Sequence, residues 1–199
     1  MSKTILTLGD SITAGANSIT SKYAVTLAKK LGYKLINKGV SGSTIKTNCN
    51  DIKTVDLTNV DIVTIMTGTN TYGKVLGTID DVKDDFNDNP ASFYGYLGFI
   101  ADYARYMNPL LKVYFITPPQ SGYPTGTVMQ SILTAFKEVG KKCSVPVIDI
   151  YSESGLLYHN EKVRKFYYSD NVHPTQLGHD IIADFIFNKI KSMQTIWLS

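Results

Sequence analysis

The amino-acid sequence predicts an α/β protein, a three-layer α/β/α sandwich built around a five-stranded parallel sheet. Short apolar runs alternate with segments of helical period, which is typical of stacked βαβ units. Right-handed crossovers between such units bury a parallel sheet on both faces. No internal repeat, linker or low-complexity segment divides the 199 residues, so we expect one domain over residues 1–199.

The apolar runs that we interpret as strands are residues 4–8, 34–37, 62–67, 112–117 and 147–150. The clearest helical segments between and after them are residues 21–31, 92–107, 128–142 and 176–193. Gly32 follows the first of these helices, where a glycine C-cap is expected. Longer insertions are predicted at 48–58, 72–89, 118–126 and 152–168. Three of them follow strand carboxyl ends, where loops shape substrate pockets in doubly wound folds.

Composition and charge exclude several classes of protein. A hydrophobic content of 43% and a formal net charge of +3 suit a globular enzyme and give no basis for a nucleic-acid partner. No apolar stretch approaches the roughly 18 residues of a membrane span. The start Met1-Ser2-Lys3 leads into a short apolar run and not into a secretory h-region, so we expect a cytoplasmic protein by default, with virion or cell-surface association equally compatible.

The two cysteines, Cys49 and Cys143, have neither a partner cluster nor ligand spacing. We therefore expect free or buried thiols and no metal or cofactor site. His159 and His179 cluster with no cysteine or further histidine and are poor metal-ligand candidates. The oligomeric state is not readable from the sequence.

Gly9-Asp10-Ser11 follows directly after the first predicted strand. A serine on a glycine-flanked turn at the carboxyl end of a first strand is where an α/β enzyme places a nucleophile, because that edge of a parallel sheet is open to ligands. The same tripeptide would also begin an ordinary helix, with Asp10 and Ser11 as capping residues. The tripeptide alone leaves both interpretations open.

Asp170 and His173 precede the last predicted helix and lie three residues apart. On a helical turn this spacing puts both side chains on one side, so that the carboxylate can accept the Nδ1 proton and leave Nε2 as a base. A serine hydroxyl needs such a base to act as a nucleophile at neutral pH. The alternative is a loop pair that caps the last helix.

Two glycine-containing segments follow the second and third predicted strands, at residues 37–44 and 68–70. A glycine there lets a backbone N–H approach a substrate with no Cβ in the way. Asn70 can donate its side-chain amide to the same oxygen. Both segments therefore offer donors for an oxyanion, although each taken singly is an ordinary turn.

Together these segments resemble the four signature blocks of the SGNH hydrolases, also called GDSL-type esterases and lipases. The matching residues are Gly9-Asp10-Ser11, Gly42 in Asn37-x-Gly39-x-Ser41-Gly42-x-Thr44, Gly68-Thr69-Asn70, and Asp170-x-x-His173-Pro174. They occur in the order of the family and extend from residue 9 to residue 174. The resemblance implies the flavodoxin-like SGNH fold, with residues 72–95 similar to a subgroup from Gram-positive bacteria and their phages.

The resemblance also implies a role for each matching residue. Ser11 would be the nucleophile, His173 the general base and then acid, and Asp170 its orienting partner. The backbone N–H groups of Ser11 and Gly42 and the amide of Asn70 would form the oxyanion hole. The third block commonly continues Gly-x-Asn-Asp, and Thr71 stands at the last place here, so another hydrogen bond would have to hold Asn70.

The function that we predict is a serine esterase that forms an acyl-enzyme on small acyl esters, with an O-acetyl group on a carbohydrate as the expected substrate. No long apolar lid, which a long-chain lipase would need, is evident. The partner is thus a small-molecule or glycan ester. The alternatives are a lysophospholipase or thioesterase, and a non-catalytic carbohydrate-binding module on the same fold. Tyrosines in the insertions, at positions 72, 123, 158, 167 and 168, suit sugar rings, although loop packing is the expected role of most.

Overall fold

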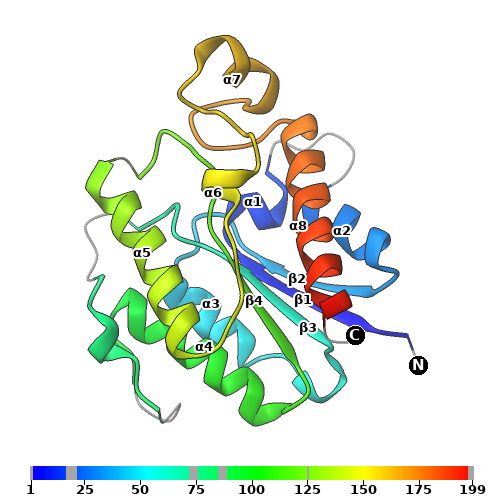
Figure 1. The fold of residues 1–199 in the computed structure, drawn as a ribbon, viewed down its shortest axis with the longest axis vertical. Coiled ribbons are helices and arrows are strands. Elements are labelled where there is room, and N and C mark those ends of the chain that lie inside the picture. The colour runs from blue at the N-terminus through cyan, green and yellow to red at the C-terminus, as the bar shows by residue number, and fades with distance from the viewer. Residues whose placement is uncertain (1, 17–21, 72–75, 85–88, 125, 197–199) are drawn as a thin grey trace.

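The computed structural model describes residues 2–16, 22–71, 76–84, 89–124 and 126–196. Its centre is a five-stranded parallel sheet of order β2-β1-β3-β4-β5, which confirms the predicted fold class (Figure 1). The strands are β1 (Thr4–Gly9), β2 (Lys34–Gly39), β3 (Ile62–Met66), β4 (Lys112–Ile116) and β5 (Val147–Ile148).

Helices cover both faces of this sheet. One face carries α2 (Tyr23–Leu31) and α8 (Gln176–Ile196). The other carries α3 (Ile45–Ile52), α4 (Phe93–Met107) and α5 (Gly126–Lys142), as Figure 1 shows. The remaining helical segments are short: α1 (Ser11–Ala14), α6 (Ile150–Glu153), α7 (Glu161–Tyr167) and the 3₁₀ turns η1 (Leu57–Asn59) and η2 (Ile79–Asp81).

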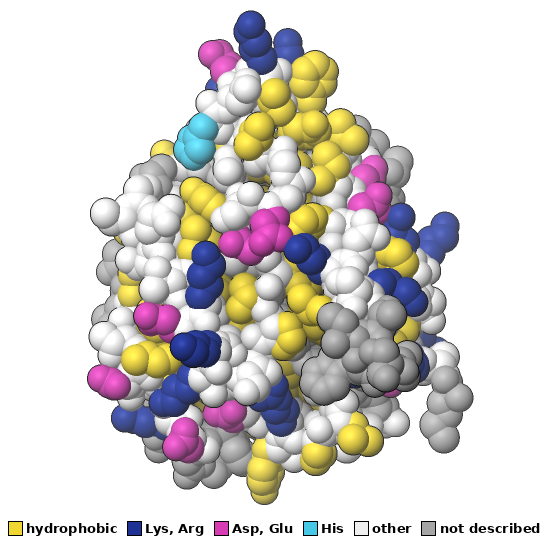
Figure 2. All heavy atoms as spheres, viewed as in Figure 1, with side chains coloured by type: hydrophobic (Ala, Val, Ile, Leu, Met, Phe, Trp, Pro, Cys, Tyr) yellow, Lys and Arg dark blue, Asp and Glu magenta, His cyan; other side chains and the backbone are white. Residues whose placement is uncertain are grey.

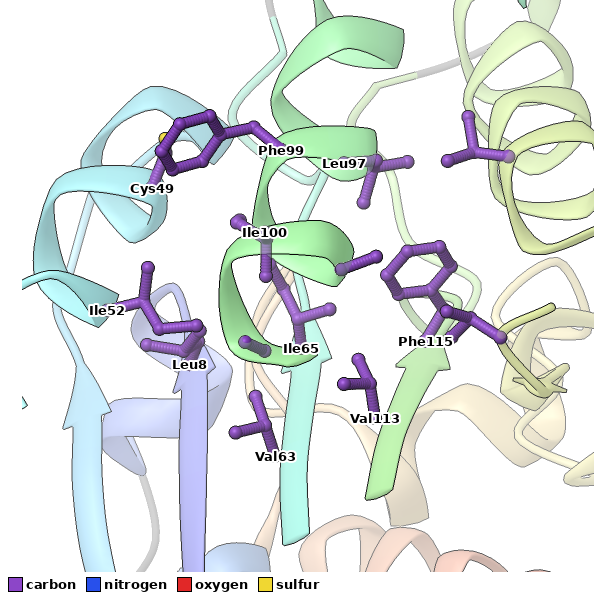
Figure 3. Packing of buried hydrophobic residues seen from close by; sticks show 14 of the residues in the cluster. Leu8, Cys49, Ile52, Val63, Ile65, Leu97, Phe99, Ile100, Val113 and Phe115 are labelled. Atoms are coloured by element: carbon purple, nitrogen blue, oxygen red, sulfur yellow. The ribbon is translucent and has the colours of Figure 1, made fainter. Parts of the chain in front are cut away.

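The alternation of side chains along each strand divides the core into two clusters. In β3, Val63 and Ile65 pack under α4 with Leu97 and Ile100 (Figure 3), whereas Ile62 faces the α2 and α8 side. Every residue of β3 is buried, as expected for a central strand of a parallel sheet with helices on both faces.

Several elements differ from the sequence prediction. Residues 48–58 were expected to form an insertion, but α3 occupies much of this segment. Thr44 and Thr47 form a capping box at its start, and Ile45, Cys49 and Ile52 form its buried side. Within the predicted insertion 152–168, Asn160 caps α7 by accepting a hydrogen bond from the Val163 N–H.

The last strand ends earlier than predicted, at Ile148, because Asp149 already caps α6 by accepting from the Ser152 N–H. The helix that was expected to begin at residue 21 begins at Tyr23, and Ser21 itself lies outside the described residues.

The strand register sets which turns meet at the carboxyl edge of the sheet. Gly9, the last residue of β1, lies opposite Gly39 of β2 and Met66 of β3. The turns that follow these three residues therefore start side by side at one edge. This edge is where parallel α/β sheets bind ligands.

The junction between β1 and α1 is tightly packed. A Cβ on Gly39 would lie 2.3 Å from the Ala14 nitrogen, and a Cβ on Gly9 would lie 2.5 Å from the Met66 oxygen. Since the nearest atoms include backbone, neither glycine can be replaced without moving α1 or β3. The two glycines thus allow α1 to lie directly against the end of β2.

Asp10 is the N-cap of α1. It is 1% exposed, and its carboxylate accepts a hydrogen bond from the Ile12 N–H at 3.0 Å. Burial raises the pKa of this carboxyl from 3.8 to about 6. Because the folded pKa lies above the unfolded one, the folded state binds the proton more tightly. Protonation therefore stabilises the fold as the pH falls from about 6 to 4, and the ionised form costs stability above this window.

We predict that Asp10→Asn changes the pH dependence of stability. Asparagine keeps a capping oxygen and removes the charge. Between pH 4 and pH 7 the wild type should lose up to about 3 kcal/mol of unfolding free energy relative to this variant. Urea unfolding at both pH values measures the difference.

Asp56→Asn is the matched control. Asp56 is an exposed N-cap whose pKa is lowered by its hydrogen bonds to Thr58. The wild type should therefore gain stability relative to this variant as the pH rises from 4 to 7, the opposite sign. An Asp10→Asn difference that is the same at pH 4 and pH 7 would contradict the prediction.

Candidate active site

The structure brings three of the predicted residues into one chain of hydrogen bonds. His173 Nε2 lies 2.9 Å from Ser11 Oγ, and His173 Nδ1 lies 2.8 Å from Asp170 Oδ2. Ser11 and His173 are 162 positions apart in the chain. The contact therefore depends on the whole fold and not on a local turn.

Ser11 is the first residue of α1 and is 7% exposed. Asp10 caps this helix from the preceding position, so the tripeptide begins a short helix and places Ser11 directly after the carboxyl end of β1. Gly15 ends α1 after one turn with a φ of 86°, a left-handed conformation that favours glycine.

Asp170 organises its own loop as well as the histidine ring. Its Oδ1 accepts the backbone N–H groups of Val172 and His173, both at 2.7 Å, and leaves Oδ2 for Nδ1. Partial burial raises the pKa of this carboxyl, but the hydrogen bonds from His173 and Val172 outweigh that effect and hold the pKa below its usual range. Asp170 is thus an anion at neutral pH, as a partner for the imidazole Nδ1–H must be.

The loop that carries Asp170 and His173 is held at several points. Tyr168 pairs with Pro174 in an antiparallel bridge, and the Ser169 N–H donates to the His173 oxygen at 2.9 Å. Asn171 is held from the other side, because its carbonyl accepts from the Gly122 N–H at 2.7 Å and its side chain from the Tyr158 hydroxyl at 3.0 Å. The last two contacts come from segments that follow β4 and β5.

The two predicted oxyanion segments lie at the same edge. Gly42 is exposed and has a φ of 77°, a conformation that favours glycine. The Asn70 amide donates to the Ser43 oxygen at 2.9 Å. Its second amide hydrogen has no acceptor among the described residues and is available to a ligand.

Thr71 is buried, and its N–H closes the turn on the Gly68 oxygen at 3.0 Å. The hydrogen bond to Ser43 thus holds Asn70 in a block where Thr71 replaces the common aspartate.

Sequence reasoning missed several residues of this region. Ser43 and Asn48 are buried, and both donate to the Gly9 carbonyl, at 2.8 Å and 3.1 Å. Nothing in the local pattern singles them out, since their common acceptor lies more than 30 positions away. For Tyr158 we expected either contact with a sugar ring or packing within its loop. It is buried, and its hydroxyl holds the Asp170 loop through Asn171, a contact that the sequence did not predict.

The tyrosines, the second histidine and the cysteines that the sequence analysis considered lie outside the hydrogen-bonded chain of Asp170, His173 and Ser11. Tyr168 is buried like Tyr158, Tyr123 is half exposed, and Tyr72 lies outside the described residues. His179 is buried, with Nε2 at 3.2 Å from the Ala16 oxygen. Cys49 and Cys143 are free thiols, and burial raises the pKa of each to about 11. Among the described residues, no three His, Cys, Asp or Glu side chains are grouped to hold a metal ion.

None of the helices in the described part of the chain combines the length and the apolar composition that crossing a membrane requires.

Comparison with solved structures gives the same fold. A possible lipase from Chitinophaga pinensis is 21% identical and superposes with a TM-score of 0.81, over 96% of this chain and 98% of that one. A protein from Lactobacillus plantarum is 24% identical, with a TM-score of 0.82 over 96% and 98%. A lipase/acylhydrolase from Enterococcus faecalis is 24% identical, with a TM-score of 0.69 over 96% of each chain. At these identities the likeness shows the fold alone.

Sequence comparison assigns the family. No curated protein matches the chain, but the model of one family, the GDSL-like lipase/acylhydrolases, matches residues 7–181. The matched range contains every residue of the hydrogen-bonded chain from Ser11 to His173. The protein therefore belongs to the GDSL-like lipase/acylhydrolase family, a family of ester hydrolases.

Proposed function

We propose that this ester hydrolase acts through an acyl-enzyme on Ser11. The observation that carries the proposal is the continuous hydrogen-bonded chain from Asp170 through His173 to Ser11. His173 takes the Ser11 proton as the hydroxyl attacks the ester carbonyl, and then returns it to the leaving alcohol. A water molecule repeats the cycle and frees the serine. Asp170 fixes the ring and stabilises the imidazolium.

The oxyanion of each tetrahedral intermediate would be bound by three donors, the backbone N–H groups of Ser11 and Gly42 and the amide of Asn70. The strand register supports this assignment, because the turns that carry these donors start side by side at one edge of the sheet. Donors that are already oriented for the developing charge typically contribute about 3 to 4 kcal/mol each to the transition state.

We further propose that the natural substrate carries a small acyl group, an O-acetyl ester on a carbohydrate. Support comes from the two oxyanion turns, in which residues 41–44 and 68–71 are all glycine, serine, threonine or asparagine. Ser43, Thr69 and Thr71 among them are buried, whereas Ser41 and Gly42 are exposed and Asn70 is partly exposed. The accessible residues offer hydrogen bonds to hydroxyl groups and little apolar surface for a long chain.

One observation favours a lipid-like ester as a second candidate. Four of the exposed large apolar side chains belong to segments that flank the Asp170 loop: Tyr123, Leu157, Phe166 and Leu177. Figure 2 shows hydrophobic side chains gathered at the end of the molecule that carries α7. Exposed apolar surface of this kind marks interaction sites in many proteins, and a lysophospholipid or acyl thioester would use it.

The first experiment tests the nucleophile and the base with p-nitrophenyl acetate. Ser11→Ala and His173→Ala should each lower kcat by roughly 10⁴-fold or more, because either one removes the activated nucleophile. Ser131→Ala, at a partly exposed position of α5, and His159→Ala, at an exposed position, are matched controls and should keep wild-type kcat. Full activity of Ser11→Ala would sink the proposed mechanism.

Asp170→Asn tests the orienting carboxylate. It removes the anion that holds the Nδ1–H, so kcat should fall by about 10³- to 10⁴-fold with KM little changed. The steady-state parameters on p-nitrophenyl acetate measure this split. An unchanged kcat would show that Asp170 only caps its loop through the backbone hydrogen bonds to Val172 and His173.

The acyl preference separates the two substrate candidates. We expect kcat/KM on p-nitrophenyl esters to be highest for acetate and to fall through butyrate to octanoate. Release of acetate from an acetylated oligosaccharide, measured beside release of fatty acid from a lysophospholipid, extends the comparison to complete substrates. Activity that rises with acyl length would instead support the lipid-like candidate.

A further inference from the structure

Ser43 connects all three segments that would supply oxyanion donors. Its hydroxyl donates to the Gly9 carbonyl at 2.8 Å, and Gly9 lies two residues before Ser11. Its carbonyl accepts from the Asn70 amide at 2.9 Å. Its own backbone follows directly after Gly42. We propose that Ser43 is a positioning residue that holds the three donors in one arrangement, an inference that rests on the proposed function.

Three hydrogen-bond donors bind the Gly9 carbonyl oxygen. The Val40 N–H donates to this oxygen at 3.2 Å and the Asn48 amide at 3.1 Å, in addition to the Ser43 hydroxyl. The carbonyl belongs to the peptide that leads into Asp10, so its orientation fixes where α1 begins. Residues from the turn after β2 and from α3 thereby hold the peptide that immediately precedes the one carrying the Ser11 N–H.

The second contact of Ser43 acts on the side-chain donor. Asn70 has two amide hydrogens, and the one on the Ser43 oxygen fixes the plane of the amide. The other hydrogen then points in one direction and needs no reorganisation when charge develops on the substrate. Such preorganisation is the basis of oxyanion stabilisation.

The side chains that bind the Gly9 carbonyl are buried. Ser43 is 5% exposed and Asn48 is 0% exposed, so water competes little for these hydrogen bonds. Neither side chain touches Ser11 or His173 in any hydrogen bond of the described residues. Ser43 would therefore act through the donors and not on the substrate itself.

The test compares Ser43→Ala with the wild type on p-nitrophenyl acetate. Loss of the hydroxyl removes the shortest of the three hydrogen bonds to the Gly9 carbonyl and leaves only those from Val40 and Asn48. The kcat should then fall by about 10- to 100-fold while KM stays within about twofold, because a small misalignment weakens transition-state contacts alone. Ser43→Cys has nearly the same shape and only a weak donor. It should lose kcat in the same way and carries the test if the alanine variant does not fold.

Thr64→Val is the matched control. Thr64 is 0% exposed in the middle of β3, and its hydroxyl has no hydrogen-bond partner among the described residues. This variant removes a buried hydroxyl from the sheet and leaves the hydrogen bonds of Ser43, Asn48 and Asn70 unchanged. It should keep wild-type kcat, and circular dichroism and thermal melting confirm that each variant is folded.

A second readout is labelling by a fluorophosphonate, followed by mass spectrometry. Ser11 Oγ forms the bond to phosphorus, fluoride leaves, and His173 takes the hydroxyl proton, while the phosphoryl oxygen occupies the place of the oxyanion. The labelling rate of Ser43→Ala should fall by about the same factor as kcat.

The outcomes separate the two proposals. A wild type that neither turns over esters nor labels on Ser11 would overturn the proposed function. An active, labelled wild type with folded Ser43→Ala and Ser43→Cys variants at wild-type kcat would leave that function standing and overturn the positioning role. A loss seen as a higher KM alone, or equally in Thr64→Val, would also overturn it.

Discussion

The parallel register of three neighbouring strands is the constraint on which the candidate site depends. Because Gly9, Gly39 and Met66 end β1, β2 and β3 at one level, the turns that follow them start within reach of one another. The β1 position is central, so its turn can receive hydrogen bonds from both sides. A shift of the register by one residue would turn every side chain of a strand to the other face. It would also separate the Gly9 carbonyl from Ser43 and Asn48.

The remaining half of the site comes from the far end of the chain and is held differently. The Asp170 loop depends on long-range hydrogen bonds to Gly122 and Tyr158 and on the bridge between Tyr168 and Pro174. The Ser11 turn directly continues a strand of the sheet, whereas the Asp170 loop is held by hydrogen bonds to segments that follow β4 and β5. Family membership accounts for ester hydrolysis.

The sequence was sufficient to predict the central strands and the long helices, because their apolar periodicity is strong and local. It also predicted which residues form the chain from Ser11 to Asp170, since these stand in recognisable blocks. It missed α3, whose eight residues are mostly polar and whose apolar positions number only three. It also missed the contacts of Ser43, Asn48 and Tyr158, because their partners lie between 13 and 39 positions away. Such contacts follow from the packing of the fold and leave no pattern in a short segment.

The distance in sequence between Ser11 and His173 has a consequence for how the protein can be studied. With the proposed roles, a molecule in which the sheet and the helices on it are intact but the Asp170 loop has come loose keeps its serine and loses its base. Such a species would retain nearly all of its secondary structure, so spectroscopy of the backbone would count it as native. In an assay of ester hydrolysis the same species would be inactive. The difference between the two signals during denaturation therefore measures how tightly the Asp170 loop is coupled to the rest of the fold.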